Sequence, residues 1–261
     1  MNVISSKDNP AVKQLKRWLD KSKRSDAIIV LEGIHLAQAY FENGLMPERI
    51  WVAQTALNNP EIKTLLSQTS SRIDVLSDTV FRSVSTLAQG ESILCEVVKS
   101  KSVAQLLDAK ANTILIDGVQ DAGNLGSILR SAAAAGVVNV YLNDACVNPF
   151  SPKVLRAGVG AHFSLNIIDA VDLSAAVIEL QAQGVKVLAT DLKAQNNIYQ
   201  TDLRQPTAWL LGSEGSGVSA ELIDAASAAV IIPMVAGESL NVAAAAAICL
   251  FETARQQNCG V

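Results

Sequence analysis

Three glycine-containing turns are the parts of this sequence best suited to hold a ligand. They span residues 117–126, 212–217 and 233–237, and each follows an apolar run that predicts a β-strand. Open α/β sheets bind their ligands beyond the carboxyl ends of the strands, where such turns gather. We therefore expect the three turns to line a single pocket.

The chain lacks the residue patterns of several common active sites. The turn at 117–124 does not have the G-x-G-x-x-G spacing of a Rossmann dinucleotide site, and neither a P-loop nor a G-x-S-x-G nucleophile elbow occurs. Two histidines, His35 and His162, leave little material for a hydrolytic triad, and we expect His162 to be structural. The cysteines include no Cys-x-x-Cys pair, so we expect no metal site and no disulfide framework. They are Cys95, Cys146, Cys249 and Cys259.

The composition is that of a globular protein. Hydrophobic residues make up 49 % of the 261 residues and charged residues 18 %. No apolar run approaches the roughly 20 residues that span a bilayer, and the first residues lack the apolar core of a signal peptide. We expect a cytoplasmic protein without membrane contact, which also suits the cysteine pattern.

Two series of alternating strands and helices position these turns. The first series, which opens with a helix at Asn9-Pro10, predicts a small α/β domain over 1–98. The polar stretch within 99–110 predicts a linker, and the second series predicts an α/β domain over 111–261. The expected strands of the first domain are 27–31, 49–53, 73–76 and 93–98, with helices at 35–41, 61–66 and 79–87.

The second series is more apolar. Its strands are near-continuous hydrophobic runs, as in parallel strands that are covered on both faces, and its last helix is expected from about 239. The expected strands are 113–116, 137–142, 165–168, 185–189, 208–211 and 230–232.

Basic residues concentrate at the N-terminal end, although the net charge is −4. Residues 1–110 carry 14 Lys and Arg against 12 Asp and Glu, whereas residues 111–261 carry 7 against 13. Seven of the basic residues lie within the first 24, beside only two acidic ones. A polyanion would meet this end first through its phosphates; the alternative is an ordinary solvated helix face.

Several segments together resemble the SpoU (TrmH) family of RNA 2′-O-ribose methyltransferases. Residues 117–132 are similar to the family's first motif, 211–218 to its second, and 231–234 with 238–243 to its third. The resemblance extends to 151–158 and to the opening of the chain. One departure is Ala122, which stands where the family commonly has proline.

The resemblance implies a fold and an activity. The fold is a small N-terminal α/β substrate-binding domain, related to RNA-binding ribosomal proteins, plus a C-terminal α/β-knot domain with a mainly parallel sheet and a trefoil knot. The cofactor is S-adenosylmethionine, bound in the knotted loops, and the working unit is a homodimer. The reaction is methyl transfer to a ribose 2′-hydroxyl of RNA. No metal is implied.

The substrate and the chemistry leave alternatives open. Ribosomal RNA is favoured because of the N-terminal domain, and transfer RNA is the alternative. A second hypothesis is a catalytically silent RNA-binding or ribosome-assembly factor on the same scaffold, and a third is methylation of a base atom.

The resemblance marks five catalytic positions. They are Asn124, Arg130, Glu214, Ser239 and Asn241. A guanidinium stays protonated in proteins, so we expect Arg130 to hold the target phosphate or ribose rather than act as a base. Each position also has a structural interpretation: a surface arginine for Arg130, a helix cap for Asn124, Ser239 and Asn241, and a helix-dipole charge for Glu214.

Further residues are assigned to the cofactor and to RNA. By resemblance, Gly212, Ile232 and Leu240 offer backbone groups to the adenosine, and Met234 adds a wall. We expect RNA phosphates to contact basic side chains of both domains, with surface salt bridges as the alternative. These side chains are Lys13, Lys16, Arg17, Lys153 and Arg156. We expect the three tryptophans, Trp18, Trp51 and Trp209, to lie in the core.

Overall fold

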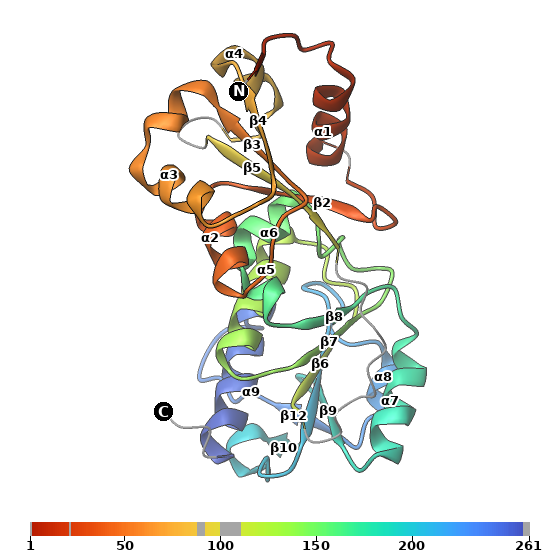
Figure 1. Cartoon of the computed structure of the whole chain (residues 1–261). Coiled ribbons are helices and arrows are strands. Elements are labelled where there is room, and N and C mark those ends of the chain that lie inside the picture. Colours follow the sequence, from red (N-terminus) through yellow and green to blue (C-terminus); the bar gives the residue numbers. More distant parts are fainter. Residues whose placement is uncertain (1, 21, 88–91, 100–110, 258–261) are drawn as a thin grey trace. The chain divides into compact units, whose positions relative to one another are not determined.

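A computed structural model describes residues 2–20, 22–87, 92–99 and 111–257 (Figure 1). The chain forms two compact units. Unit 1 consists of Met1–Lys101 with Phe150–Phe163, and unit 2 of Ser102–Pro149 with Ser164–Val261. Of the predicted linker 99–110, all but Lys99 lies outside the described residues.

Unit 1 contains a five-stranded mixed sheet in the order β1-β4-β3-β5-β2. β1, β3 and β4 are parallel, and β5 runs antiparallel to both β3 and β2. The strands are β1 (Val3–Ile4), β2 (Ile28–Glu32), β3 (Arg49–Ala53), β4 (Arg72–Leu76) and β5 (Ile93–Val98). The helices are α1 (Pro10–Asp20), α2 (Ile34–Glu42), α3 (Pro60–Ser67), α4 (Asp78–Val84) and α6 (Pro152–Gly158), with a 3₁₀ turn at Gln54–Asn58 and another at Ala161–Phe163.

Local chemistry explains where these helices begin. The Asn9 side chain accepts a hydrogen bond from the Ala11 amide, and Pro10 occupies the first turn of α1, where its missing N–H costs nothing. Asn59 and Ser77 cap α3 and α4 in the same manner. α4 ends at Val84, three residues earlier than predicted, because the Ser85 hydroxyl and the Thr86 amide turn to bind the Glu32 carboxylate.

The segment 150–163 corrects the predicted domain division, which placed it with residues 111–261. Its side chains pack within unit 1: the Arg156 guanidinium lies 3.2 Å from a carboxylate oxygen of Glu32, and the rings of Phe163 and Tyr40 meet edge to face at 5.0 Å. Position along the chain could not reveal this, because the partners lie more than 100 residues away.

Unit 2 contains a seven-stranded parallel sheet in the order β10-β12-β9-β11-β6-β7-β8. The strands are β6 (Thr113–Ile116), β7 (Asn139–Leu142), β8 (Asn166–Ile168), β9 (Lys186–Thr190), β10 (Asn196–Asn197), β11 (Thr207–Leu211) and β12 (Ala228–Ile231). The helices are α5 (Ala122–Ala134), α7 (Leu173–Ala182), α8 (Ala220–Ala225) and α9 (Val242–Gln256), with a 3₁₀ turn at Ile198–Gln200.

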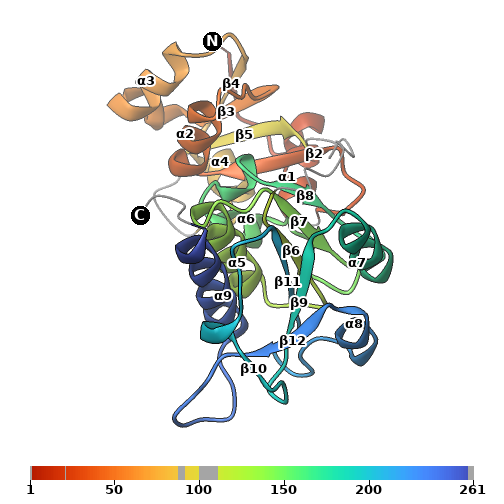
Figure 2. The same ribbon diagram turned by 90° about the horizontal axis from the view of Figure 1, so that it is seen from below.

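The sheet of unit 2 is covered on both faces. α5 and α9 pack together on one face, and α7 and α8 lie on the other (Figures 1 and 2). This is the mainly parallel α/β sheet that the resemblance implied, and it is consistent with the α/β-knot fold. α9 begins at Val242, later than predicted, because the Asn241 side chain caps it. The short edge strands β1 and β10 were not predicted, since two residues give no periodic pattern.

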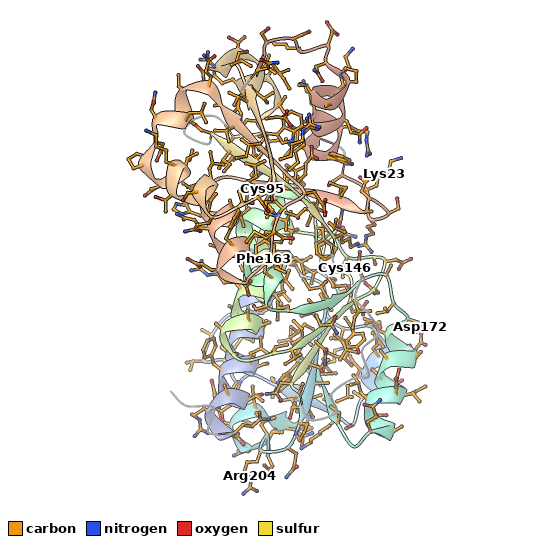
Figure 3. All side chains as sticks on the ribbon, in the orientation of Figure 1. Lys23, Cys95, Cys146, Phe163, Asp172 and Arg204 are labelled. Atoms are coloured by element: carbon orange, nitrogen blue, oxygen red, sulfur yellow. The ribbon has the colours of Figure 1, made fainter. Side chains whose placement is uncertain are left out.

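The predicted core residues are mostly found in place. Trp51 and Trp209 are fully buried, whereas Trp18 is only half-buried. Cys95, Cys146 and Cys249 are buried thiols (the first two are labelled in Figure 3), and Cys259 lies outside the described residues. No described helix is long and apolar enough to cross a bilayer. The described residues also contain no cluster of His, Cys, Asp and Glu that could hold a metal ion.

A buried carboxylate lies inside unit 1. The Trp51 Nε1–H donates to Glu96 Oε1 at 2.7 Å, and the Arg49 guanidinium stacks 3.7 Å from the Trp51 ring centre. Burial raises the pKa of Glu96 above its ordinary value, although the Trp51 hydrogen bond and Arg49 both oppose the shift. Folding therefore disfavours the charged form of Glu96 relative to the unfolded chain.

We predict that Glu96→Gln stabilises the protein at neutral pH. A pKa raised by folding contributes stability that is present below the unfolded-state pKa and is lost as pH rises through the folded-state pKa. Glutamine keeps an acceptor for Trp51 without the buried charge, so the variant should be more stable than the wild type at pH 7, and the gain should vanish toward pH 4. Thermal unfolding between pH 4 and 8 measures this. Glu48→Gln, at an exposed position, controls for the loss of one charge. A stabilisation by Glu96→Gln that is larger at pH 4 than at pH 7 would contradict the prediction.

Candidate active site

The loops after three adjacent strands of unit 2 line one cavity of about 740 Å³. They follow β9, β11 and β12, whose carboxyl ends lie at the same edge because the strands are parallel. The lining residues come from 190–193, 211–220 and 230–245, together with Ile223. The volume falls within the range of small-molecule and cofactor sites. Two of the three predicted turns, 212–217 and 233–237, thus contribute to the wall directly.

The loop 212–218 is closed on itself. The Ser213 amide donates to the Gly217 carbonyl at 3.2 Å, and the Gly217 amide donates back to Ser213 at 3.0 Å. The hydroxyls of Ser213 and Ser216 lie 2.8 Å apart. A Cβ at Gly212 would lie 1.9 Å from the carbonyl carbon of Gly217, so no other residue fits this crossing without movement of the backbone.

The remaining predicted turn, 117–126, is joined to this wall by three hydrogen-bonded side chains, Asn124, Glu214 and Asn241, which we call the trio. The Asn124 Nδ2 group donates to Glu214 Oε1 at 2.6 Å, and the Asn241 Nδ2 group donates to Asn124 Oδ1 at 2.9 Å. The trio therefore brings together all three motifs, which are separated by 90 and 117 residues along the chain.

The trio decides between the functional and structural interpretations of two asparagines. Asn124 is not a helix cap: Asp121 caps α5 by accepting from the Asn124 amide at 2.7 Å, which leaves the Asn124 side chain for Glu214 and Asn241. Asn241 does both, since its Oδ1 accepts from the amides of Ala243 and Ala244 while its Nδ2 reaches Asn124.

Most of the other residues predicted for the site also line the cavity. Gly212, Ile232, Met234 and Leu240, which were assigned to the cofactor, all line the cavity, as do Glu214 and Ser239. Their placement makes an apolar wall beside a polar rim.

Arg130 lies outside this wall. It is six residues beyond Asn124 on α5, which places it about 9 Å further along the helix and on a different side. The side chain is exposed and does not line the cavity, and it has no hydrogen-bond or ion-pair partner among the described residues. Within one chain, Arg130 therefore does not join the other predicted site residues at the cavity.

The basic residues assigned to RNA have different surroundings. Lys16 and Lys153 are exposed, and Lys13 forms an exposed pair with Asp8. Arg17 pairs with Asp26 and lies 5.8 Å from the ring centre of Trp18. These four side chains are at least partly exposed to solvent.

Arg156 is different. Its guanidinium contacts the Glu32 carboxylate, of which only 1 % is exposed, and it donates to the Thr86 hydroxyl at 3.0 Å. It compensates a buried charge, so the structural interpretation accounts for it without RNA. His162 is likewise buried, as predicted.

The loop after β9 was missed by the sequence reasoning. Asp191, Leu192 and Lys193 line the cavity, and the Asp191 carboxylate accepts from the Lys193 amide at 3.1 Å. The signal that could have found them is the end of the predicted strand 185–189. The three predicted turns are marked by glycine, and this turn contains none.

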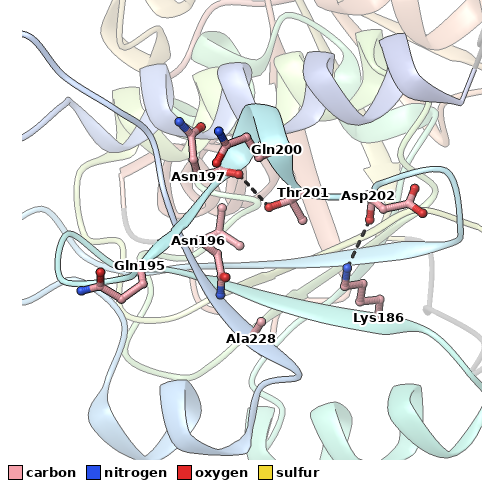
Figure 4. Close-up of a pocket in the computed structure, with 9 residues that line it drawn as sticks. Lys186, Gln195, Asn196, Asn197, Gln200, Thr201, Asp202 and Ala228 are labelled. Carbon is pink, nitrogen blue, oxygen red and sulfur yellow. Dashed lines mark hydrogen bonds between the residues drawn. The ribbon is translucent and has the colours of Figure 1, made fainter.

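A smaller hollow of about 330 Å³ lies at the edge of the same sheet, beside β10 (Figure 4). Three of its polar side chains already donate to backbone carbonyls: Lys186 Nζ to Asp202, Thr201 Oγ1 to Asn197, and Asn196 Nδ2 to Ala229. With these groups engaged, we assign the hollow no ligand.

Comparison with known proteins identifies the family to which the chain is similar. Residues 111–251 match the SpoU rRNA Methylase family. The chain is 31 % identical to the 23S rRNA (guanosine(2553)-2′-O)-methyltransferase RlmP of Bacillus subtilis, over 96 % of this chain and 98 % of the relative. It is similar to a crystal structure of an RNA 2′-O ribose methyltransferase, with a TM-score of 0.83, 28 % identity and coverage of 98 % and 99 %. An AdoMet-bound rRNA methyltransferase from Sinorhizobium meliloti has a TM-score of 0.83, 26 % identity and 97 % coverage of both chains.

We predict that Gly212→Ala destabilises unit 2, whereas Gly215→Ala does not. The added methyl at 212 collides with the Gly217 backbone, while a Cβ at 215 meets nothing within 4 Å. Forcing atoms into a packed backbone crossing costs about 1–3 kcal/mol. Urea unfolding of both variants measures the difference, and equal midpoints would contradict the close approach.

Proposed function

The chain belongs to the SpoU rRNA methylase family, and from that premise we propose how its active site works. It is an S-adenosylmethionine-dependent enzyme that methylates ribose 2′-hydroxyls of ribosomal RNA, the activity named for relatives that align with most of the chain. The observation that carries this conclusion is the Asn124–Glu214–Asn241 trio beside a cofactor-sized cavity.

The residues of the cavity fit S-adenosylmethionine. Ile232, Met234 and Leu240 provide an apolar wall for a purine, and the backbone at Gly212 is open to the cavity. The carboxylates of Asp191, Glu214 and Glu238 suit a ligand that carries a sulfonium and an ammonium group. When bound, the cofactor supplies an electrophilic methyl group on sulfur.

The trio positions the acceptor ribose. Because Asn124 Oδ1 accepts the hydrogen bond from Asn241, the Asn124 amide nitrogen points toward Glu214. Glu214 Oε2 forms no hydrogen bond among the described residues and can accept one from a ribose hydroxyl. Ser239, at the same rim, offers a hydroxyl to the same sugar. Holding the hydroxyl in line is the main task of the protein in such a displacement.

Arg130 acts on RNA from outside the single-chain cavity. Its guanidinium is suited to a bidentate grip on a phosphate, which would in turn receive the hydroxyl proton directly or through solvent. We propose that the enzyme works as a homodimer, in which α5 lies near the interface and Arg130 meets the substrate. Phe251 on the neighbouring helix α9 is 46 % exposed, which supports a covered face there.

The other assignments are proposals of the same kind. Residues 1–98 together with 150–163 form the RNA substrate-binding domain, with Lys13, Lys16, Arg17 and Lys153 as phosphate contacts, and residues 111–149 with 164–261 form the catalytic domain. The protein acts in the cytoplasm. A catalytically silent factor is disfavoured, because such a factor has no need of the trio.

The proposal predicts a sugar-methylated product. Unmodified ribosomal RNA incubated with the protein and S-adenosylmethionine, then digested to nucleosides, should yield a 2′-O-methylnucleoside by mass spectrometry. A base-methylated nucleoside would overturn the proposed chemistry. Absence of cofactor binding in calorimetry, with RNA affinity intact, would instead identify a silent factor.

In the same assay we predict that Arg130→Lys lowers turnover about 10- to 100-fold, since lysine lacks the planar fork. Its dissociation constant for S-adenosylmethionine should not change, because Arg130 does not line the cavity. Near-normal turnover would refute the bidentate role.

We also predict that Lys16→Ala weakens RNA binding, whereas Lys63→Ala does not. Both are exposed lysines on helices of unit 1, but only Lys16 belongs to the basic N-terminal helix. Loss of one phosphate contact should lower the slope of log affinity against log salt by about 0.7–0.9. Filter binding at several salt concentrations measures both variants, and equal slopes would contradict the assignment.

A further inference from the structure

Asp117 bonds to both ends of the glycine-rich loop that forms one wall of the cavity. Its backbone amide donates to the Leu211 carbonyl at 2.8 Å, where the loop leaves β11. Its carboxylate oxygen Oδ2 accepts from the Ser219 amide at 2.9 Å, where the loop enters α8. Asp117, which directly follows β6, thus holds together the two ends of the loop 212–218.

A second residue fixes the Asp117 carboxylate. The Asn143 Nδ2 group donates to Asp117 Oδ1 at 2.7 Å, and Asn143 Oδ1 accepts from the Gly118 amide at 3.0 Å. Asn143 directly follows β7, so the arrangement joins the ends of β6, β7 and β11. Both Asp117 oxygens are therefore engaged, each with a defined donor.

We propose that Asp117 is a positioning residue for the cofactor site, which acts by holding the loop that carries Glu214. It does not line the cavity, so it acts through the loop rather than on the ligand. The loop has its own internal bonds between Ser213 and Gly217, but these fix only its shape. The bonds of Asp117 fix where that shape sits relative to Asn124 and the cavity.

The inference rests on the proposed function, and a reciprocal exchange tests it. Asp117→Asn replaces one of the two acceptor oxygens by an NH2 group. Whichever way the amides at positions 117 and 143 are turned, one N–H group then faces another N–H group instead of an acceptor. Asn143→Asp sets two carboxylates face to face. In the double variant every bond can form again: the new amide at position 117 accepts from Ser219 and donates to the new carboxylate at position 143, which still accepts from Gly118.

We expect each single variant to bind S-adenosylmethionine about tenfold or more weakly in calorimetry, as for loss of a hydrogen bond to a charged group. The double variant should return to within about threefold of the wild type. Single variants that bind normally, or a double variant no better than either, would overturn the proposal.

Asp172→Ala is the matched control for the truncation Asp117→Ala. Asp172 caps the start of α7 (Figure 3), where its side chain accepts hydrogen bonds from the backbone amides of Ser174 and Ala175 in the same unit, and it does not line the cavity. Its loss should lower the melting temperature but leave cofactor affinity unchanged. A drop in affinity equal to that of Asp117→Ala would mean that destabilisation alone explains the effect, which would overturn the proposal.

Hydrogen exchange without any cofactor separates this proposal from the proposed function. The amides of 212–219 should exchange faster in Asp117→Ala and at the wild-type rate in Asp172→Ala. If the wild-type protein bound no S-adenosylmethionine, the proposed function would fail, but the exchange rates would still decide whether Asp117 holds the loop. Unchanged rates would refute it.

Discussion

The side-chain amide of Asn124 is the interaction on which the site depends. It accepts from Asn241 and donates to Glu214, so one planar group sets the distance between loops from three different strands. An amide can do this because it offers a donor and an acceptor in a fixed relative direction. A carboxylate or an ammonium at this position would satisfy only one of the two neighbours.

The parallel sheet makes that meeting possible. β11 lies between β6 and β9, and β9 lies next to β12, so the turns that follow these strands emerge at one edge. Helices on both faces bury the strands, and the long apolar cluster between the sheet and α7 and α8 makes the platform rigid. Functional loops can then be irregular, because their ends are fixed by buried strands. The close approach of Gly212 to Gly217 is an extreme case, since the loop crosses itself without room for a methyl group.

Unit 1 contains a buried charged residue that is compensated by its neighbours. Glu32 is buried at the end of β2, and its oxygens accept from Ser85, Thr86 and Arg156. Arg156 comes from the segment 150–163, which joins β7 to β8 of unit 2. The buried ion pair thus ties this segment to unit 1, because separating the two would leave an uncompensated charge in the interior.

The sequence by itself determined the elements and the residues of the site. Continuous apolar runs such as 113–116 and 208–211 predicted the buried parallel strands, because a strand that is covered on both faces needs no polar alternation. Resemblance to the motifs identified Asn124, Glu214 and Asn241. Tertiary structure alone decided which of these residues meet and what else meets them. The Asn124–Glu214 bond, the Arg156–Glu32 pair and the cavity wall at 190–193 depend on contacts across 90 or more residues or on a turn without glycine. Local patterns carry no such information, because they record which face of an element is apolar and not which distant element covers it.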